Sequence, residues 1–409
     1  MVKICFVSSL YPPFVLGGAE INVKREAEGL AQRGHQITVI STSPDRKSYA
    51  EEVNGVRIYR LSPLNLYPMF RHQDAPTLAR PLWHVLDLWN PDSYREIKTV
   101  WENDRPDVVH VNNFKGLSLS VFSVAKRLEL PSIFTAHDYS LICPRANLLK
   151  SSGEICHTPS RLCLVYGAIQ KHLVNDKVSV FTAPSQFVID RLKLSGLFAS
   201  ARSLKLPYGI ETSKGRVEKD YKTIDILYVG AINKHKGIHV LKEVIIQLNQ
   251  DNVRFHIAGK GENMGEIERL ASSNPNVIFH GFVPNEQLVE LYQKANVVIV
   301  PSIWYEPSAI VILESFHAGT PVIGSRTGGI PELIEPERNG FLFEPGNSEE
   351  LKAILENLIN NPSQLGKLEE GAFQSGRKYG LSEHIDRLEE IYTELANATS
   401  MRNSKIASL

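Results

Sequence analysis

The chain has 409 residues, of which 43% are hydrophobic and 22% are charged, and its 45 Lys and Arg balance its 45 Asp and Glu. This composition is that of a soluble globular protein and excludes a disordered or collagen-like chain, because Gly and Pro are near average usage. No apolar run reaches the roughly 18 residues that a membrane-spanning helix requires. A single core rarely serves more than about 250–300 residues, so we expect two domains.

The balanced charge is unevenly distributed. Residues 1–205 carry 25 Lys and Arg against 18 Asp and Glu, a net charge of +7, and the remainder carries −7. This asymmetry is compatible with chance, or with a first half that contacts an anionic partner such as a membrane surface or an acidic acceptor. Met1–Leu10 reads as a first strand and not as a signal peptide. We therefore expect a cytoplasmic protein, with possible association at the inner face of a membrane.

In the first half of the chain, short apolar runs predict buried strands and amphipathic stretches predict helices. The predicted strands are Lys3–Ser8, Gln36–Ser41, Asp107–Val111, Ser132–Thr135 and Val178–Ala183, and the predicted helices are Ala19–Arg33 and Leu117–Leu128.

The pattern restarts near residue 224, after the polar stretch Thr212–Lys222, which is typical of a linker. The predicted strands here are Ile224–Val229, Val253–Ala258, Val277–His280, Val297–Pro301 and Pro321–Gly324, with helices between them. A last helix is predicted at Ser382–Leu395, and the tail after Asn397 is predicted to be frayed.

Alternating strands and helices predict an α/β fold with two doubly wound, Rossmann-like domains. We expect the domains at residues 1–211 and 212–381, with the C-terminal helix, residues 382–409, packing back on the first. Ligands of such sheets bind beyond the carboxyl ends of the strands, so we expect the two domains to face across a deep cleft.

Several nucleotide-binding motifs are absent from the sequence. There is no G-x-G-x-x-G after a strand and no P-loop, which argues against a dinucleotide-dependent dehydrogenase and a P-loop NTPase. There is also no Asp-x-Asp pair to hold a metal-bound diphosphate. A diphosphate here would be neutralised by basic side chains and helix N-termini.

The second half offers such groups in two loops. Lys234 and Lys236 follow the strand Ile224–Val229, although a solvated surface position is the alternative for either lysine. Pro307 is suited to the first turn of a helix, which would leave the amides of Ala309 and Ile310 free to bind an anion.

Two glutamates flank this predicted helix start. Glu306 lies directly before Pro307, and Glu314 lies eight residues further on, in a stretch that is otherwise mostly apolar. A buried carboxylate requires partners, so Glu314 is a candidate binding residue, with a surface-facing position as the alternative.

The Glu306-x7-Glu314 pattern resembles the motif of glycosyltransferase family 4, retaining enzymes of the GT-B architecture that use nucleotide-sugar donors. Other short motifs occur in the family's order and extend the resemblance over most of the chain. They are Gly17-Gly18-Ala19-Glu20, Arg33-Gly34-His35, Thr135-Ala136-His137-Asp138, Pro207-Tyr208-Gly209-Ile210, Lys236-Gly237, Gly259-Lys260-Gly261, Gly319-Thr320-Pro321-Val322-Ile323 and Gly328-Gly329-Ile330-Pro331-Glu332.

The resemblance implies catalytic roles for Lys236, Glu306 and His137. Lys236 would grip the donor diphosphate, and Glu306 and His137 would face the donor sugar. Glu314 would hold the ribose hydroxyls.

The resemblance also implies a wider donor site in the second domain and an acceptor side in the first, near Asn112. The remaining donor-binding residues implied are Gly17, Gly18, Gly230, Gly281, Phe282, Val283, Ser308, Ala309 and Ile310.

The sequence departs from the family pattern at two positions. Ala231 stands where the family commonly has Arg, so one positive charge near the leaving diphosphate is missing. Lys234 or Arg326 could compensate. Ala309 stands where the family favours Gly, and its methyl group narrows the approach of the phosphate.

Cys143, Cys156 and Cys163 lie close together in the sequence, with His157 beside Cys156. Three thiolates and an imidazole could bind a structural metal ion. The spacings are not those of a common zinc knuckle, so unligated thiols are the alternative.

The implied function is a retaining hexosyltransferase that moves a sugar from a nucleoside diphosphate donor, with uridine expected as the base, to an acceptor hydroxyl. Expected acceptors are a glycan or a lipid-linked glycan, in polysaccharide or glycolipid synthesis. We expect no cofactor, no divalent metal for transfer and no nucleic-acid partner. The alternatives are a nucleotide-sugar epimerase of similar fold and a non-catalytic partner that binds the nucleotide sugar.

Overall fold

The computed structural model describes residues 1–15, 17–71, 76, 79–211, 217–248 and 250–407, and the chain divides into two compact units. The first unit comprises Met1–Ala146, Thr158–Pro207 and Ser382–Leu409, and the second comprises Asn147–His157 and Tyr208–Leu381. The division therefore falls between Pro207 and Tyr208, four residues before the boundary expected from the sequence. The linker predicted at Thr212–Lys222 lies partly outside the described residues.

The first unit is built on an eight-stranded sheet with the order β3-β4-β2-β1-β5-β6-β7-β8, in which β3 and β4 are antiparallel and the other pairs are parallel. The strands are β1 (Lys3–Val7), β2 (Gln36–Thr42), β3 (Tyr49–Val53), β4 (Val56–Leu61), β5 (Val108–Val111), β6 (Ser132–Thr135), β7 (Val180–Ala183) and β8 (Arg202–Lys205). The helices are α1 (Gly18–Gln32), α2 (Ala79–Leu88), α3 (Pro91–Asp104), α4 (Ser120–Arg127), α5 (Arg161–Val174), α6 (Gln186–Leu194) and α13 (Leu381–Ala407), with the 3₁₀ turn η1 (Met69–Arg71).

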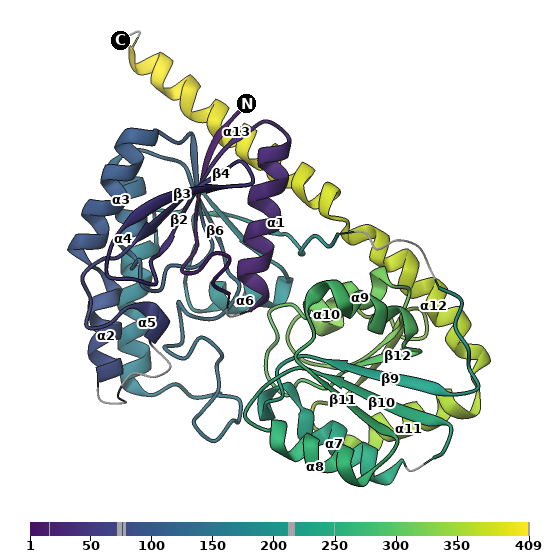
Figure 1. Ribbon diagram of the computed structural model, residues 1–409. Helices are drawn as coiled ribbons and strands as arrows, with labels where there is room; N and C mark the ends of the chain where they lie inside the picture. Colours follow the sequence, from purple (N-terminus) through teal and green to yellow (C-terminus); the bar gives the residue numbers. More distant parts are fainter. Residues whose placement is uncertain (16, 72–75, 77–78, 212–216, 249, 408–409) are drawn as a thin grey trace. The chain divides into compact units, whose positions relative to one another are not determined.

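Helices cover both faces of this sheet (Figure 1). The helices α1 and α13 lie on one side of it, and α2, α3, α4 and α5 lie on the other. Every residue of β5, β6 and β7 is consequently buried. Strands buried on both faces read as continuous apolar runs, which is why the sequence revealed them.

The second unit is built on a six-stranded parallel sheet with the order β11-β10-β9-β12-β13-β14. The strands are β9 (Ile224–Val229), β10 (Val253–Ala258), β11 (Val277–Gly281), β12 (Val297–Val300), β13 (Val322–Ser325) and β14 (Gly340–Phe343). The helices are α7 (Ile238–Gln247), α8 (Met264–Ser273), α9 (Asn285–Lys294), α10 (Ile310–His317), α11 (Ser348–Asn360) and α12 (Ser363–Gly376), with the 3₁₀ turns η2 (Lys234–Lys236), η3 (Ile330–Glu332) and η4 (Arg377–Tyr379).

Two apolar clusters fill the two faces of the second sheet. Side chains of α7 and α11 pack on one face, around residues such as Leu241 and Leu355. Side chains of α9 and α10 pack on the other, around residues such as Tyr292 and Phe316. The fold class predicted from the sequence, two doubly wound α/β domains, is confirmed.

The predicted strands are all present, with ends that shift by up to two residues, but four strands were missed. Three of these, β3, β4 and β8, lie toward the edges of the first sheet, and β14 is the edge strand of the second. The hairpin β3–β4 turns at Asn54 and Gly55, which both have positive φ, and an Asn-Gly pair between alternating residues is a hairpin signal that was overlooked.

The C-terminal prediction was wrong in length. The chain does not fray after Asn397, because α13 continues to Ala407. Polar residues on this stretch suggested a tail, but Thr399 Oγ1 donates to the Leu395 carbonyl oxygen at 3.1 Å within a regular helix. A polar helix of this kind is compatible with exposure on both sides.

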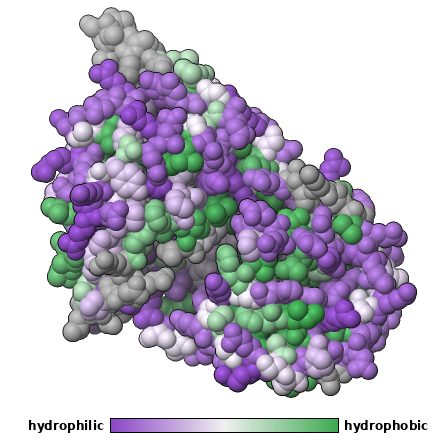
Figure 2. All heavy atoms as spheres, viewed as in Figure 1, coloured by the Kyte–Doolittle hydropathy of each residue, from purple (hydrophilic) through white to green (hydrophobic). Residues whose placement is uncertain are grey.

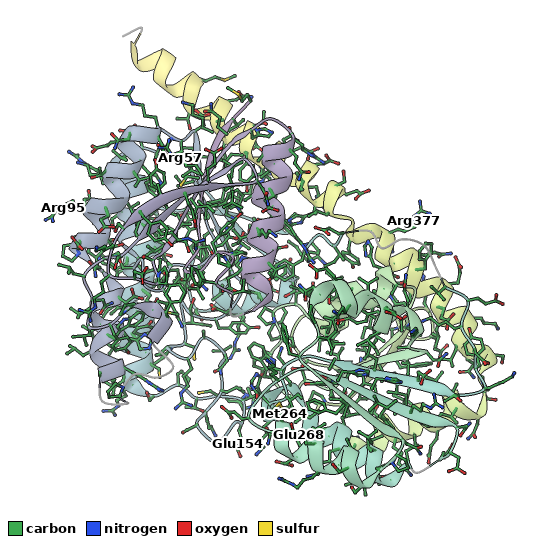
Figure 3. All side chains as sticks on the ribbon, viewed as in Figure 1. Arg57, Arg95, Glu154, Met264, Glu268 and Arg377 are labelled. Atoms are coloured by element: carbon green, nitrogen blue, oxygen red, sulfur yellow. The ribbon has the colours of Figure 1, made fainter. Side chains whose placement is uncertain are left out.

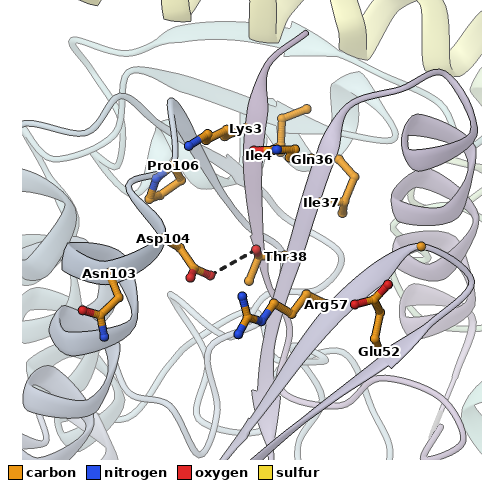
Figure 4. Close-up of a pocket in the computed structure, with 11 residues that line it drawn as sticks. Lys3, Ile4, Gln36, Ile37, Thr38, Glu52, Arg57, Asn103, Asp104 and Pro106 are labelled. Atoms are coloured by element: carbon orange, nitrogen blue, oxygen red, sulfur yellow. Dashed lines mark hydrogen bonds between the residues drawn. The ribbon is translucent and has the colours of Figure 1, made fainter.

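A polar pocket of about 510 Å³ lies near the amino-terminal ends of β1, β2 and β4, beside the end of α3. Arg57 projects from β4 (Figure 3) and lies between Asp104 and Glu52 in the close-up (Figure 4). Thr38 Oγ1 donates to Asp104 Oδ2 at 3.3 Å. Because the pocket is at the opposite end of the strands from the carboxyl-end loops, it is separate from the candidate site described below.

Candidate functional site

In the second unit, the predicted donor-binding loops come together at the carboxyl ends of neighbouring strands. The Gly259 amide donates to the Gly281 carbonyl oxygen at 2.7 Å, and the Gly230 amide donates to the Ala258 carbonyl oxygen at 3.0 Å. A Cβ added at Gly259 would lie 1.8 Å from the Gly230 carbonyl oxygen. These loops therefore pack backbone against backbone, and only glycine allows that approach.

The loop that carries Lys236 is anchored to the end of β12. Gly237 has a φ of 75°, and a Cβ there would lie 1.7 Å from the carbonyl oxygen of Pro301. The Ile303 amide donates to the His235 carbonyl oxygen at 3.0 Å. The two loops that the sequence marked for anion binding are thus held against each other.

Lys236 and Glu306 form an ion pair in this position. Lys236 Nζ donates to Glu306 Oε1 at 2.7 Å, and the Ser302 hydroxyl donates to the same oxygen at 2.7 Å. The Lys236 side chain is 29% exposed and that of Glu306 is 4% exposed. Lys236 Nζ also lies 5.2 Å from the centroid of the Trp304 ring, at cation–π distance. The buried carboxylate therefore has the partners that it requires, and the lysine remains reachable from solvent.

The backbone of Glu306 is fixed from behind by the loop that follows β13. The Gly329 amide donates to the Glu306 carbonyl oxygen at 2.7 Å. Gly328 has a φ of 58°, and a Cβ there would lie 2.4 Å or less from backbone atoms of Glu306. The motif Gly328-Gly329 thus acts by supporting the glutamate loop.

The start of the following helix differs from the prediction. Pro307 was expected in its first turn, but α10 begins at Ile310, with Ala309 as N-cap at φ −85° and ψ 93°. The bond from Gly329 holds Glu306 outside the helix, so the chain from Pro307 to Ala309 leads into it. The first helical amides, of Ile310 and Val311, lack intrahelical acceptors by geometry. Among the described residues, the buried Ser308 hydroxyl has no hydrogen-bond partner either.

Glu314 lies in the second turn of α10 and is half-buried. The Tyr292 hydroxyl, from α9, donates to Glu314 Oε2 at 2.9 Å. Burial, and then the Glu314 carboxylate, raise the pKa of Tyr292 well above its ordinary value, so the tyrosine stays a donor. Glu314 is therefore held in place on the helix and is not a freely rotating surface carboxylate.

At the other end of the loop cluster, β11 ends at Gly281, whose φ is 63°. The Phe282 side chain is exposed, and Lys260 Nζ lies 4.9 Å from the centroid of its ring. Val283 is half-buried beside them. An exposed aromatic ring next to a strand end offers a flat surface to a ligand.

The two candidates for replacing the charge missing at Ala231 differ. Arg326 Nε donates to Glu344 Oε1 at 3.0 Å in an exposed ion pair, so this arginine is engaged elsewhere. Lys234 Cδ lies 3.7 Å from where a Cβ on Gly153 would be, in the short hairpin at residues 147–157. Lys234 is the better candidate, because it lies in the same short 3₁₀ turn as Lys236.

In the first unit, Gly17 caps α1 and Gly18 is its first residue. Both glycines are exposed, and the Gly17 amide donates to Glu20 Oε2 at 2.9 Å. Glu20 thus stabilises the N-terminus of α1 as a capping residue. The predicted glycine loop is in this way placed at the carboxyl end of β1.

His137 and Asn112 follow the adjacent strands β6 and β5, and their side chains meet. His137 Nε2 lies 2.8 Å from Asn112 Oδ1. Burial lowers the pKa of His137, partly opposed by Glu26 and Asp138. The imidazole is therefore neutral near pH 7.

Sequence reasoning missed a buried polar group beside this pair. Glu26 on α1 accepts from His384 Nε2 on α13 at 2.9 Å, and both side chains are almost fully buried. His110 Nδ1 lies 2.7 Å from the Tyr392 hydroxyl, also on α13. Glu26 lies on α1, His110 on β5, and His384 and Tyr392 on α13, so these residues are far apart in the sequence and give no local motif.

The cysteine cluster predicted as an alternative metal site does not form. Among the residues that the structure describes, no group of three or more His, Cys, Asp or Glu side chains is placed to hold a metal ion. Cys143, Cys156 and Cys163 form no disulfide, and all three are half-buried. The Ser160 hydroxyl, which caps α5, lies 3.2 Å from Cys163 Sγ. Proximity in sequence did not produce proximity in space, because Cys156 lies in the short hairpin and Cys163 in α5.

Comparisons with known proteins identify the family of the chain. The family model described as Glycosyltransferase Family 4 matches residues 16–214, and the one described as Glycosyl transferases group 1 matches residues 209–375. An uncharacterized glycosyltransferase of Methanocaldococcus jannaschii is 30% identical over 368 residues, which cover 86% of this chain and 87% of that protein.

Two solved structures share the fold. Sucrose-phosphate synthase from Thermosynechococcus elongatus superposes with a TM-score of 0.77 at 19% identity, covering 97% of this chain and all of the other. HepE of Anabaena, in complex with UDP and glucose, superposes with a TM-score of 0.71 at 19% identity, covering 96% and 100%. The chain therefore belongs to glycosyltransferase family 4 and is a glycosyltransferase of the GT-B fold.

Proposed function

We propose that this glycosyltransferase is a retaining hexosyltransferase that transfers a sugar from a nucleoside diphosphate donor to an acceptor hydroxyl. The observation that carries the proposal is the pairing of Lys236 with Glu306 at the start of α10. A cation, a buried carboxylate and free helical amides within one loop cluster suit a ligand that combines a diphosphate with a sugar.

In this proposal each part of the donor binds a different loop, as the family motif implies. The diphosphate binds Lys236, the amides of Ile310 and Val311 and the Ser308 hydroxyl. When the diphosphate binds, Lys236 pairs with it in place of Glu306. Glu306 can then accept hydrogen bonds from sugar hydroxyls. Glu314 binds the ribose, and the backbone around Gly281 meets the base, beside Phe282.

Uridine is the base that we propose. Its support is that HepE, which shares the fold, is described in complex with UDP and with UDP-glucose. The identity of the base is therefore the first quantity to measure.

We propose transfer on one face of the sugar. The bond from the anomeric carbon to the leaving phosphate breaks while the acceptor oxygen bonds to the same face, and the leaving phosphate takes the acceptor proton. Lys236 and the α10 amides stabilise the charge that develops on the phosphate. In this scheme His137 contacts the donor sugar, as the family motif implies, and Asn112 belongs to the acceptor side with Gly17 and Gly18. No divalent metal takes part.

The proposed acceptors are glycans or lipid-linked glycans, and the proposed location is the cytoplasm at the inner face of a membrane. The net charge of +7 on residues 1–205 supports an anionic surface as a neighbour of the first unit.

A two-step experiment tests the proposal. A thermal-shift screen of UDP-, GDP- and ADP-sugars identifies the donor, since a ligand at a hundred times its Kd adds about 2.7 kcal/mol of stability. The donor is then incubated with candidate acceptors, and NMR reports the anomeric configuration of the product. We expect retention of configuration and release of the nucleoside diphosphate.

Three results would contradict the proposal. An inverted product would exclude the retaining mechanism. A new sugar isomer formed from the donor alone would indicate an epimerase. Donor binding without release of nucleoside diphosphate with any acceptor would indicate the non-catalytic partner, which Ala231 in place of arginine makes the main competitor.

A further inference from the structure

A group of polar side chains in the first unit is buried and incompletely bonded. Asn22 and Glu26 lie on α1 and Asn112 directly follows β5, and they are 2%, 3% and 4% exposed. Within the part of the chain that the structure describes, Asn22 Oδ1, Glu26 Oε2 and Asn112 Nδ2 have no hydrogen-bond partner. Hydrophilic side chains cover much of the face drawn in Figure 2 and meet solvent there, whereas a buried polar atom has to be satisfied inside the protein. These three atoms therefore mark a small polar site.

Glu26 is the charged member of this group. Its Oε1 accepts hydrogen bonds from Asn22 Nδ2 at 2.5 Å and from His384 Nε2 at 2.9 Å, so this oxygen has two donors while Oε2 has none. Burial would raise the pKa of Glu26, but the bond from His384 outweighs it and holds the pKa below its ordinary value. The carboxylate is therefore ionised near pH 7, and Oε2 requires a donor. Glu26 is also the main influence that opposes the lowering of the His137 pKa by burial, so these two side chains are near each other.

The residues that face Glu26 from the sheet lie on one side of it. His110 and Asn112 are two residues apart, and alternate residues of a strand point to the same side. His110 Nδ1 lies 2.7 Å from the Tyr392 hydroxyl of α13, so this is the side that α1 and α13 cover (Figure 1). On the neighbouring strand, Thr135 Oγ1 lies 2.6 Å from His110 Nε2, which places His137, two residues further on, at the same side. Asn112 and His137 therefore project toward α1.

The three unpartnered atoms match the hydrogen-bonding capacity of one water molecule. Glu26 Oε2 and Asn22 Oδ1 only accept hydrogen bonds, and Asn112 Nδ2 only donates. A water here donates its two protons to the two oxygens and accepts from the amide nitrogen, which is the three-bond pattern typical of buried waters. With the Asn112 amide reversed, three oxygens would compete for two protons. The carboxylate therefore favours the orientation in which Asn112 Oδ1 faces His137, 2.8 Å from its Nε2.

We propose that Glu26 is a positioning residue for His137 and acts through one buried water and the Asn112 amide. The carboxylate orients the water, the water orients the amide, and the amide oxygen holds the imidazole proton on Nε2. The His137 ring is thereby presented in a single tautomer. This relay depends on contacts of the first unit alone, and only its consequence for sugar transfer rests on the function proposed above.

The first test uses the parent protein and needs no substrate. A high-resolution crystal structure should show an ordered water within hydrogen-bond distance of Asn22 Oδ1, Glu26 Oε2 and Asn112 Nδ2. Two-bond ¹H–¹⁵N NMR of protein labelled with ¹⁵N-histidine should show a neutral His137 that carries its proton on Nε2, with His137→Gln to assign the signals. The absence of a water at this position, or a proton on Nδ1 in the parent, would overturn the proposal.

The decisive variant is Glu26→Gln. Asn22 Nδ2 and His384 Nε2 both donate at the Oε1 position, so the new amide should place its oxygen there and its NH₂ group toward the water. The water would then donate to Asn22 and to Asn112, whose amide turns over and donates to His137. We expect the imidazole proton to move from Nε2 to Nδ1. The matched control is His384→Gln, which keeps a donor for Oε1 and the charge of Glu26 and should leave the proton on Nε2.

Kinetics then measure the consequence for transfer. Glu26→Gln should lower kcat about tenfold, as expected for one lost hydrogen bond, and should leave the Kd of the nucleoside diphosphate unchanged. A Glu26→Gln protein that keeps the proton on Nε2 would overturn the proposal, as would a His384→Gln protein that moves it to Nδ1. A moved proton with unchanged kcat would uphold the relay and contradict the placement of His137 at the donor sugar, so the two proposals fail separately.

Discussion

His137 Nε2 lies 2.8 Å from Asn112 Oδ1, and the two residues follow neighbouring strands of the first sheet. An amide oxygen accepts hydrogen bonds, so this contact assigns the proton of the neutral imidazole to Nε2. It also fixes the orientation of the ring. Asn112 is therefore a positioning residue for His137, a relationship that neither motif shows alone.

The first prediction separates binding from chemistry at this pair. His137→Ala should lower kcat by about tenfold to a hundredfold, because its contact with the sugar strengthens toward the transition state, and should leave nucleoside diphosphate affinity unchanged. Asn112→Ala should give a smaller loss of kcat and an altered pH profile. Steady-state kinetics over a pH series and calorimetry provide the measurements. If His137→Ala lowers the melting temperature while the folded enzyme keeps its kcat, the residue is structural.

The second prediction concerns the ion pair of the second unit. Lys236→Met should weaken donor binding by about 1.5–3 kcal/mol, the contribution of a charge-assisted hydrogen bond to phosphate. It should also destabilise the unliganded protein, since Glu306 stays buried with a charge and loses its cation. The control is Lys242→Met, because Lys242 and Glu266 also pair at 2.7 Å but in an exposed position. Donor affinity and melting temperature that respond equally to both variants would refute the assignment.

The third prediction concerns Glu314. Glu314→Gln should raise the donor KM and the nucleoside diphosphate Kd about tenfold with a smaller fall in kcat, because the ribose does not react. Tyr292→Phe removes the hydroxyl that holds Glu314 and should produce a weaker effect of the same kind. A collapse of kcat at unchanged nucleotide affinity in Glu314→Gln would place this carboxylate at the reacting sugar instead.

The fourth prediction concerns metal. Transfer should persist in EDTA, since Lys236 and the α10 amides replace a divalent ion in neutralising the diphosphate. Assays with and without chelator, followed by Mg²⁺ or Mn²⁺ addition, provide the test. Activity that disappears in EDTA and returns with either ion would show that a metal is part of the site.

The fifth prediction concerns stability and pH in the first unit. Burial lowers the pKa of His110 from 6.5 to about 4, while the nearby Glu26 carboxylate partly opposes the shift. Between these values the unfolded chain binds the proton and the folded chain does not, so the free energy of unfolding falls as the pH falls. The contribution of His110 should be about 2 kcal/mol between pH 7 and pH 5.

Denaturant unfolding of the parent and of His110→Gln at both pH values measures this contribution. The variant should lose less stability on acidification than the parent, although His137 contributes a slope of the same sign because burial lowers its pKa too. Identical pH dependence in the two proteins would show that His110 does not carry the effect.

The sequence by itself determined the fold and the identity of the main site residues. Strands such as Ile224–Val229 are buried on both faces, so their apolar runs stand out in the sequence. Lys236 and Glu306 were identified because a short motif and its spacing can be recognised directly in the sequence. Their placement at adjacent strand ends follows from the parallel order of the sheet.

Only the tertiary structure decided which groups meet across long separations. The hydrogen bond from the Gly329 amide to the Glu306 carbonyl oxygen holds Glu306 outside the helix, and α10 begins at Ile310. The preference of Pro307 for the first turn of a helix does not predict this later start. The pairing of Glu26 with His384 joins residues 358 positions apart. Cys143, Cys156 and Cys163 are an example of the opposite case: they are near one another in the sequence but are not grouped to bind a metal ion. Side chains of opposite or complementary chemistry find each other through the packing of whole elements, and that packing is not encoded in any short stretch of the chain.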